Sequence, residues 1–295
     1  MPLDIYKHKI GDAEITQIVE LEFGGLVQGL LPHATKEEIQ KIEWIGPFVK
    51  EDMSLHAISQ SFFVKVNNRL LVLDTCIGNE KDIQEMAGWN NMNLPYLQAM
   101  EEAGIDRFKV TDVLCSHLHV DHVGWNTYKK DGKWLPTFPN AKYHFAQSEY
   151  DYWTKHQPEN SFDELQKVVF QESVEPIVEA GLTNFVATDA NLGDGMQLIS
   201  TPGHTHSHVS LQITSGDKTF ILGGDMSHHP VQIANTDWTL ALDYNGEQST
   251  ATRNKLFSEI ADTPTIFTCT HFSLPSFGHV TKDVNGKFAF KLIEK

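Results

Sequence analysis

The chain has 295 residues, with 39 Asp and Glu against 23 Lys and Arg, and so carries a formal net charge of −16 at pH 7. This negative balance repels phosphate backbones and argues against a general nucleic-acid-binding protein. A hydrophobic content of 40% excludes wholesale disorder, and the 15 His residues are many for so acidic a chain.

Short β-rich segments alternate with helical ones. Residues 13–21 read as a strand, and residues 61–66 and 69–74 read as a hairpin. The Asn67-Asn68 pair between them tolerates the positive φ of a tight turn. Their β-branched and aromatic content predicts further strands at 110–115, 142–146, 196–200, 209–214, 219–223, 265–270 and 287–292.

Four helices are predicted between these strands. Thr35 caps a short helix through Ile42, Asn93 caps one that ends at Gly104, Ser161 opens a third, and Ser249 begins the last. Pro176 kinks or ends the third helix. Interleaved strands and helices favour two mixed β-sheets between helices over a single barrel, which is an α/β fold.

Two apolar stretches, 23–31 and 44–48, mark the segment 24–57 and the residue before it. This segment is either ordinary core or a lid or dimer arm whose apolar face suits an acyl chain or an aromatic ester. No repeat or low-complexity linker interrupts the chain, so we expect one domain over residues 1–295. A homodimer is compatible with such an arm.

The three Cys residues cannot form a disulfide framework, and no pair has zinc-finger spacing. Residues 1–9 contain the acidic Asp4 and no apolar run, so we expect no signal peptide. No stretch is apolar and long enough to span a membrane. We therefore expect a cytoplasmic protein with a small-molecule substrate and neither membrane nor nucleic-acid partners.

The most informative motif is His117-Leu118-His119-Val120-Asp121-His122, which follows an apolar strand. Unpaired buried imidazoles are costly, whereas imidazole and carboxylate are the donors that Zn²⁺, Mn²⁺ or Fe²⁺ accept. Three further donors, His204, Asp225 and His271, also follow predicted strands. Sites in α/β proteins gather at such strand ends, so four of them predict a dinuclear metal site.

The motif resembles the His-x-His-x-Asp-His signature of the metallo-β-lactamase-fold hydrolases, and the resemblance extends from Asp74 to His271. It implies an αβ/βα sandwich with two metals at the sheet edges. His117, His119 and His204 are then expected to bind the first metal, and Asp121, His122 and His271 the second. Asp225 is expected to bridge both, and Asp74 to orient a metal-binding His.

Five His and two Asp suit two Zn²⁺ ions, with Mn, Fe or Co as alternatives. A water that bridges the two ions loses a proton near neutral pH, and the resulting hydroxide attacks a carbonyl or phosphoryl group. Asp121 is a candidate to receive the proton. Residues 201–210 resemble the matching stretch of acyl-homoserine lactonases, although His206 and Ser207 stand where lactonases usually carry Pro and Gly.

Two departures from the family pattern narrow the range of expected reactions. No Cys stands among the second-metal ligands, as it does in the commonest zinc β-lactamases, and Cys115 and Cys269 are expected to be small buried residues instead. Lactonases carry a Tyr three residues after the bridging Asp, where this chain has His228. His228 is either a catalytic donor or acid, or a packing residue, and His229 shares the second alternative. His206 and His208 are expected to make hydrogen bonds around the ligands.

The resulting prediction is a dinuclear zinc hydrolase of a neutral apolar ester, with a lactone of the quorum-quenching type as the leading substrate. An aryl phosphotriesterase is the alternative within the hydrolases. A mononuclear iron sulfur dioxygenase needs only the first-metal ligands, and the complete second set argues against it. A structural metal site needs only four ligands, which fill the coordination shell of one ion. The seven candidate ligands here, for two ions, leave room for a substrate and argue against that class as well.

Overall fold

The computed structural model describes residues 2–84 and 86–293, and these residues divide into two compact units. Unit 1 comprises Met1–Glu20 and Ser59–Ala187, and unit 2 comprises Leu21–Ile58 and Thr188–Lys295. The single domain over 1–295 stays a prediction, and its residues 1, 85, 294 and 295 lie outside the described part. No described helix combines the length and apolarity needed to cross a membrane.

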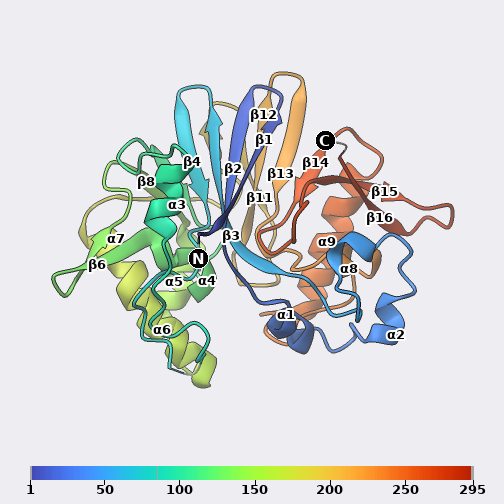
Figure 1. The fold of residues 1–295 in the computed structure, drawn as a ribbon, viewed down its shortest axis with the longest axis horizontal. Coiled ribbons are helices and arrows are strands. Elements are labelled where there is room, and N and C mark those ends of the chain that lie inside the picture. Colours follow the sequence, from blue (N-terminus) through green and yellow to red (C-terminus); the bar gives the residue numbers. More distant parts are fainter. Residues whose placement is uncertain (1, 85, 294–295) are drawn as a thin grey trace. The chain divides into compact units, whose positions relative to one another are not determined.

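Unit 1 is built on a seven-stranded mixed sheet in the order β1-β2-β3-β4-β5-β8-β9. The strands are β1 (Asp4–Ile10), β2 (Ala13–Glu22), β3 (Ile58–Val66), β4 (Arg69–Leu73), β5 (Asp112–Leu114), β8 (Lys142–Ala146) and β9 (Thr183–Val186), with a separate hairpin of β6 (Thr127–Lys130) and β7 (Lys133–Pro136). Its helices, which gather beside this sheet in Figure 1, are α3 (Tyr96–Glu102), α4 (Val120–Val123), η2 (Gly124–Asn126), α5 (Gln147–Lys155), α6 (Ser161–Ser173) and α7 (Glu175–Glu179).

Unit 2 is built on a second seven-stranded mixed sheet, in the order β10-β11-β12-β13-β14-β15-β16. The strands are β10 (Asn191–Gly193), β11 (Met196–Ser200), β12 (Val209–Ser215), β13 (Lys218–Leu222), β14 (Ile266–Thr268), β15 (Gly278–Lys282) and β16 (Phe288–Leu292). The helices of this unit are α1 (Gly24–Leu30), α2 (Lys36–Ile39), η1 (Gly46–Phe48), α8 (Val231–Ala234) and α9 (Gly246–Ile260). The predicted α/β class with two mixed sheets is confirmed.

The predicted hairpin is present as the antiparallel pair β3 and β4, in which Val66 pairs with Arg69. Asn67 has a φ of +52°, the left-handed conformation that a two-residue turn requires and that Asn tolerates. All ten strand segments predicted from the sequence contain a strand, because β-branched and aromatic residues pack well on a pleated surface.

Helix starts differ more from prediction. Thr35 caps α2 as expected, since its hydroxyl accepts from Glu38 N at 3.3 Å. The predicted cap Asn93 is wrong, because α3 begins only after Pro95, whose fixed φ suits a helix start. Ser249 is also wrong as a start, because Asn245 caps α9 by accepting from Gln248 N at 3.0 Å.

Two other predictions concern α6. Asn160, rather than Ser161, caps this helix by accepting from Asp163 N at 3.0 Å. The effect of Pro176 is confirmed: α6 ends at Ser173, and Pro176 lies in the first turn of α7.

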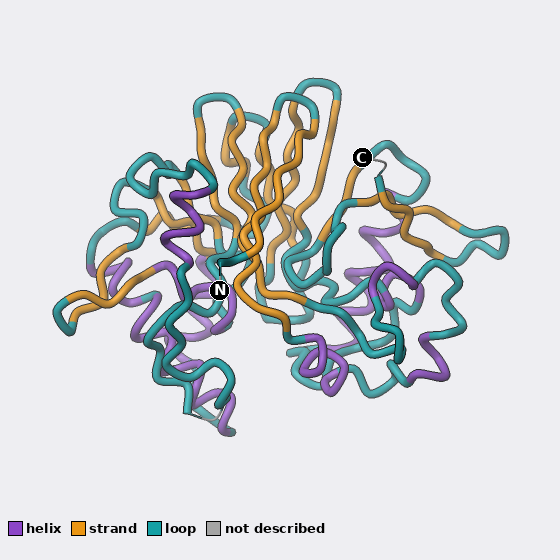
Figure 2. The backbone as a smooth tube through the Cα atoms, in the orientation of Figure 1, coloured by secondary structure: helices purple, strands orange, loops and turns teal. Residues whose placement is uncertain are grey.

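The segment 24–57 belongs to unit 2, where Figure 2 shows its short helices α1 and α2 in purple. Its apolar side chains join the buried core of that unit, as the alternative of ordinary core predicts. Val27, Leu31 and Phe48 are among them, packed in one cluster with Phe257 and Phe272 of the same unit. A lid or dimer-arm role for this segment stays a prediction.

Candidate metal centre

In unit 1 the predicted ligands follow strand β5, and Asp74 follows the neighbouring strand β4. Strands β4 and β5 are parallel with Leu73 opposite Leu114, so the residues after them emerge at one edge of the sheet. Asp74 follows β4 with a φ of +55° and a fully buried side chain. Its Oδ1 accepts from Ser116 N at 2.8 Å, which fixes the start of the loop that carries the histidine motif.

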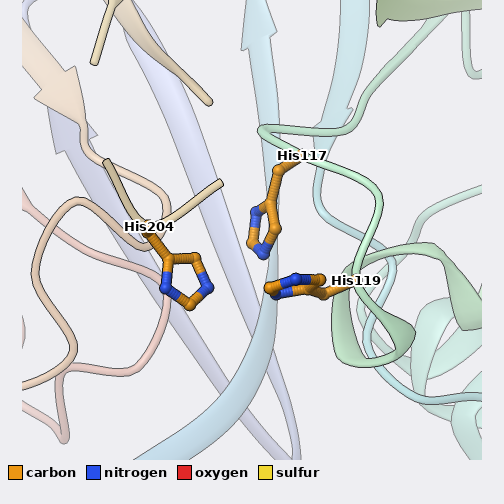
Figure 3. A group of neighbouring side chains, drawn as sticks. All are labelled: His117, His119 and His204. Atoms are coloured by element: carbon orange, nitrogen blue, oxygen red, sulfur yellow. The ribbon is translucent and has the colours of Figure 1, made fainter. Parts of the chain in front are cut away.

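The four motif donors of unit 1 converge. The ring centroids of His117 and His119 lie 4.5 Å apart, edge to face, on the loop after β5 (Figure 3). The His117 and His122 ring centroids are 4.1 Å apart, and His122 Nε2 lies 3.7 Å from Asp121 Oδ2. All three His side chains are buried, and the Asp121 side chain is 13% exposed.

Two of these rings are oriented through Nδ1. His122 Nδ1 lies 2.9 Å from Asp74 Oδ2, so Asp74 contacts a motif histidine as the family resemblance implies. His117 Nδ1 lies 3.0 Å from Ser116 Oγ. A partner on one ring nitrogen fixes the tautomer and the ring plane, and it presents the other nitrogen to a metal.

In unit 2 the sheet topology brings three more predicted donors to one edge. Strands β11 and β13 are both antiparallel to β12, and β13 is parallel to β14 with Leu222 opposite Thr268. Strands β11, β13 and β14 therefore run in the same direction. The loops after their carboxyl ends carry His204 (Figure 3), Asp225 and His271.

One carboxylate oxygen lies at the centre of this group. Asp225 Oδ2 lies 3.0 Å from His228 Nε2, 3.1 Å from His271 Nε2 and 3.6 Å from His204 Nε2. All four side chains are buried, and ligand atoms of Asp225, His204 and His228 lie within 4.8 Å of one another. Three imidazole nitrogens around one carboxylate oxygen form a donor set of the kind that a divalent cation accepts.

The candidate ligands His204 and His271 of unit 2 also make their protein contacts through Nδ1. His271 Nδ1 donates to Ile58 O at 3.0 Å. His204 Nδ1 lies 3.0 Å from Asp243 Oδ1. Burial acts to raise the pKa of Asp243, but the hydrogen bond and charge of His204 outweigh it and lower that pKa below the ordinary value. Asp243 was missed by sequence reasoning, because it belongs to no motif and lies 39 residues from its partner.

His228 belongs to the cluster. Its ring lies edge to face with His204, at a centroid distance of 4.5 Å, and stacks on His271 at 5.6 Å. Burial lowers the pKa of His228 to about 4, despite the opposing charge of Asp225. Its Nδ1 has no hydrogen-bond partner within the described residues. A catalytic role for His228 stays a prediction.

Three further histidines, His206, His208 and His229, lie close in sequence to these donors. His208 is fully buried and bridges Thr201 Oγ1 and Asp225 N, each at 2.8 Å, so both ring nitrogens are used in hydrogen bonds. His229 binds Phe48 O at 2.8 Å and is a packing residue. His206 is exposed.

The chemistry of both donor sets fits zinc. Every donor is an imidazole nitrogen or a carboxylate oxygen, which Zn²⁺ and similar divalent ions accept. Cys115 and Cys269 are buried, as expected, and Cys115 Sγ lies 3.6 Å from the Asn126 side-chain amide. The candidate ligands His117, His122, His204 and His271 share one arrangement, in which Nδ1 contacts another protein group.

Comparison with known proteins identifies similar chains. The profile of the metallo-beta-lactamase superfamily matches residues 57–271. A Xenopus laevis protein, metallo-beta-lactamase domain-containing protein 1, is 27% identical over 179 residues, which are 59% of this chain and 63% of that protein. The chain therefore spans less than two thirds of the length of this curated relative.

Solved structures share the fold at low sequence identity. AbOPH, described as a hydrolase in the beta lactamase superfamily, has a TM-score of 0.80 at 20% identity and 99% and 98% coverage of the two chains. AidC, described as a dizinc quorum-quenching lactonase in complex with a product, has a TM-score of 0.77 at 20% identity, with the same coverage. A probable metal-dependent hydrolase from Staphylococcus aureus has a TM-score of 0.73 at 16% identity, covering 98% and 99%.

Proposed function

The chain belongs to the metallo-beta-lactamase superfamily of metal-dependent hydrolases, and on this premise we propose that it is a dinuclear zinc hydrolase that opens a lactone or a related neutral, apolar ester. The observation that carries the proposal is Asp225, whose Oδ2 faces the Nε2 atoms of His204, His228 and His271 within 3.6 Å. The description of AidC as a dizinc lactonase supports the choice of zinc and of a lactone.

The proposed ligands are the seven that the motif and the family resemblance indicate. They are His117, His119 and His204 for one ion, Asp121, His122 and His271 for the other, and Asp225 for both. Support comes from each unit taken by itself, because the donors of unit 1 converge and the donors of unit 2 surround Asp225.

The protein's own groups have distinct parts in this proposal. When bound, two such ions lower the pKa of a water and polarise the ester carbonyl. Asp74 and Asp243 hold the rings of His122 and His204, so these imidazoles keep one tautomer during turnover. Asp121, whose side chain is 13% exposed, is the proposed acceptor of the proton released on attack.

His228 is the second proposed catalytic residue, in contact with the reacting substrate. Its neutral ring, favoured by burial, lies between His204 and His271. Because lactonases carry a Tyr at the matching position, His228→Tyr is expected to retain measurable lactone hydrolysis, while His228→Phe loses about 10²-fold or more in kcat. Equal kcat values for the Phe variant and the wild type would instead assign His228 to packing.

The charge of the chain supports a neutral substrate. With a net charge of −16, the protein repels anions at long range, whereas an uncharged lactone or ester is unaffected. Phosphate monoesters and nucleic acids are therefore disfavoured relative to neutral esters.

Metal analysis and a substrate panel test the proposal. We expect two Zn²⁺ per chain and hydrolysis of an acyl-homoserine lactone in preference to a β-lactam, a thioester and an aryl phosphotriester. Asp225→Ala should lower turnover by at least about 10³-fold, because it removes a ligand proposed for both ions, while the exposed Asp217→Ala serves as the control. One iron per chain with oxygen uptake, or unchanged turnover in Asp225→Ala, would refute the proposal.

A further inference from the structure

One buried amide side chain fastens the histidine motif of unit 1 to a helix. Gln166 lies on α6 and has no exposed surface. Its Oε1 accepts from Val120 N at 3.1 Å, and its Nε2 donates to Leu118 O. These two backbone groups flank His119, so the Gln166 side chain holds the chain on both sides of one predicted ligand.

The ring of His119 is also held by aromatic side chains of two helices, α5 and α6. Trp153 of α5 and Phe162 of α6 both meet it edge to face, with ring centroids 5.6 and 5.3 Å away. Trp153 is itself fixed, because its Nε1 donates to the buried Glu149 at 2.9 Å. Backbone hydrogen bonds and aromatic contacts thus restrict both the position and the ring plane of His119.

We propose that Gln166 is a positioning residue for the metal ligand His119, acting together with Trp153 and Phe162. The inference rests on the proposed function only in that His119 binds a zinc ion. Both hydrogen bonds of Gln166 lie in a fully buried environment, where an unmatched backbone N–H or C=O is costly. Loss of the amide therefore favours a shifted loop, in which the His119 ring no longer matches the geometry that a bound ion needs.

A nearby cavity makes the substitution practicable. Trp153, Gln166 and Phe170 contribute to the lining of a cavity of about 140 Å³ in unit 1. Methionine is unbranched and close to glutamine in length, so it fits this space without overpacking. Gln166→Met therefore removes both hydrogen bonds with little change in volume.

The test measures zinc affinity in the full chain by competition with a chromophoric chelator. For Gln166→Met we expect the dissociation constant of one zinc ion to rise about 10- to 100-fold. Gln171→Met, an exposed position on the same helix, should leave it unchanged. Amide hydrogen exchange at Val120 should accelerate only in Gln166→Met, which shows that the intended bond is lost.

Two outcomes would overturn the inference. One is zinc affinity within twofold of the wild type in a folded Gln166→Met protein with faster Val120 exchange. If that variant does not fold, Phe162→Leu takes its place, because Phe162 is only partly buried, and unchanged zinc affinity there is the second overturning outcome. If the wild type binds zinc but cleaves no lactone, the proposed function fails, while these affinities still decide the role of Gln166.

Discussion

Asp243→Asn isolates the contribution of the carboxylate that contacts the proposed metal ligand His204. Asp243 Oδ1 lies 3.0 Å from His204 Nδ1, Oδ2 accepts from Leu240 N at 3.1 Å, and the side chain is 1% exposed. Asparagine keeps the shape but removes the charge, and one of its two ends must present an NH₂ group to a donor. A hydrogen bond to a charged group contributes about 1.5–3 kcal/mol. At about 1.4 kcal/mol per factor of ten, this predicts roughly a 10- to 100-fold weaker zinc affinity.

The assay is competition for zinc at pH 7.5, with thermal melting of the metal-free protein measured in parallel. The exposed Asp237→Asn removes a charge from the same segment and serves as the matched control. The expected result is weaker zinc binding in Asp243→Asn alone. Equal zinc affinity in the two variants, with both folded, would refute the argument that Asp243 orients His204.

Three further predictions concern stability. Gly124→Ala should cost about 3 kcal/mol or more in urea unfolding, because its Cβ would lie 1.8 Å from Ile77 O; a smaller loss means that this backbone contact can relax. Gly29→Ala in α1 meets open space and should stabilise the protein by about 0.5–1 kcal/mol, and a lower melting temperature would contradict this. Burial raises the pKa of Glu20 from 4.5 to about 7, so between these pH values the native state holds a proton that the unfolded chain releases. The free energy of unfolding should therefore fall as the pH rises from about 4.5 to about 7. Glu20→Gln should lack this part of the decline, and equal slopes in urea titrations across that pH range would show the reasoning to be wrong.

Strands and strand-end donors could be predicted because their signals are local. The bounds of β8 and β11, 142–146 and 196–200, agree with the predicted segments. Donors placed directly after strands meet because neighbouring parallel strands end at one edge, so the sequence positions of Asp225 and His271 already suggest their association.

Caps and supporting residues could not be predicted in the same way. Several Ser and Asn residues near a helix start compete to cap it, and Asn245 rather than Ser249 makes the hydrogen bond in α9. Gln166 and Asp243 lie 46 and 39 residues from the groups they hold. Their contacts depend on tertiary packing of α6 and of the chain before α9, which no local pattern specifies.

Because β13 and β14 are parallel neighbours, the distance between Asp225 and His271 does not depend on the length of the chain between these strands. Asp225 and His271 are 46 residues apart, yet their 3.1 Å contact follows from strands that pair Leu222 with Thr268. Surface insertions in the intervening chain that leave this strand pairing, His228 and Asp243 in place should keep the contacts of Asp225 intact. Insertions there can therefore alter the surroundings of this pair without changing the contact between Asp225 and His271 itself.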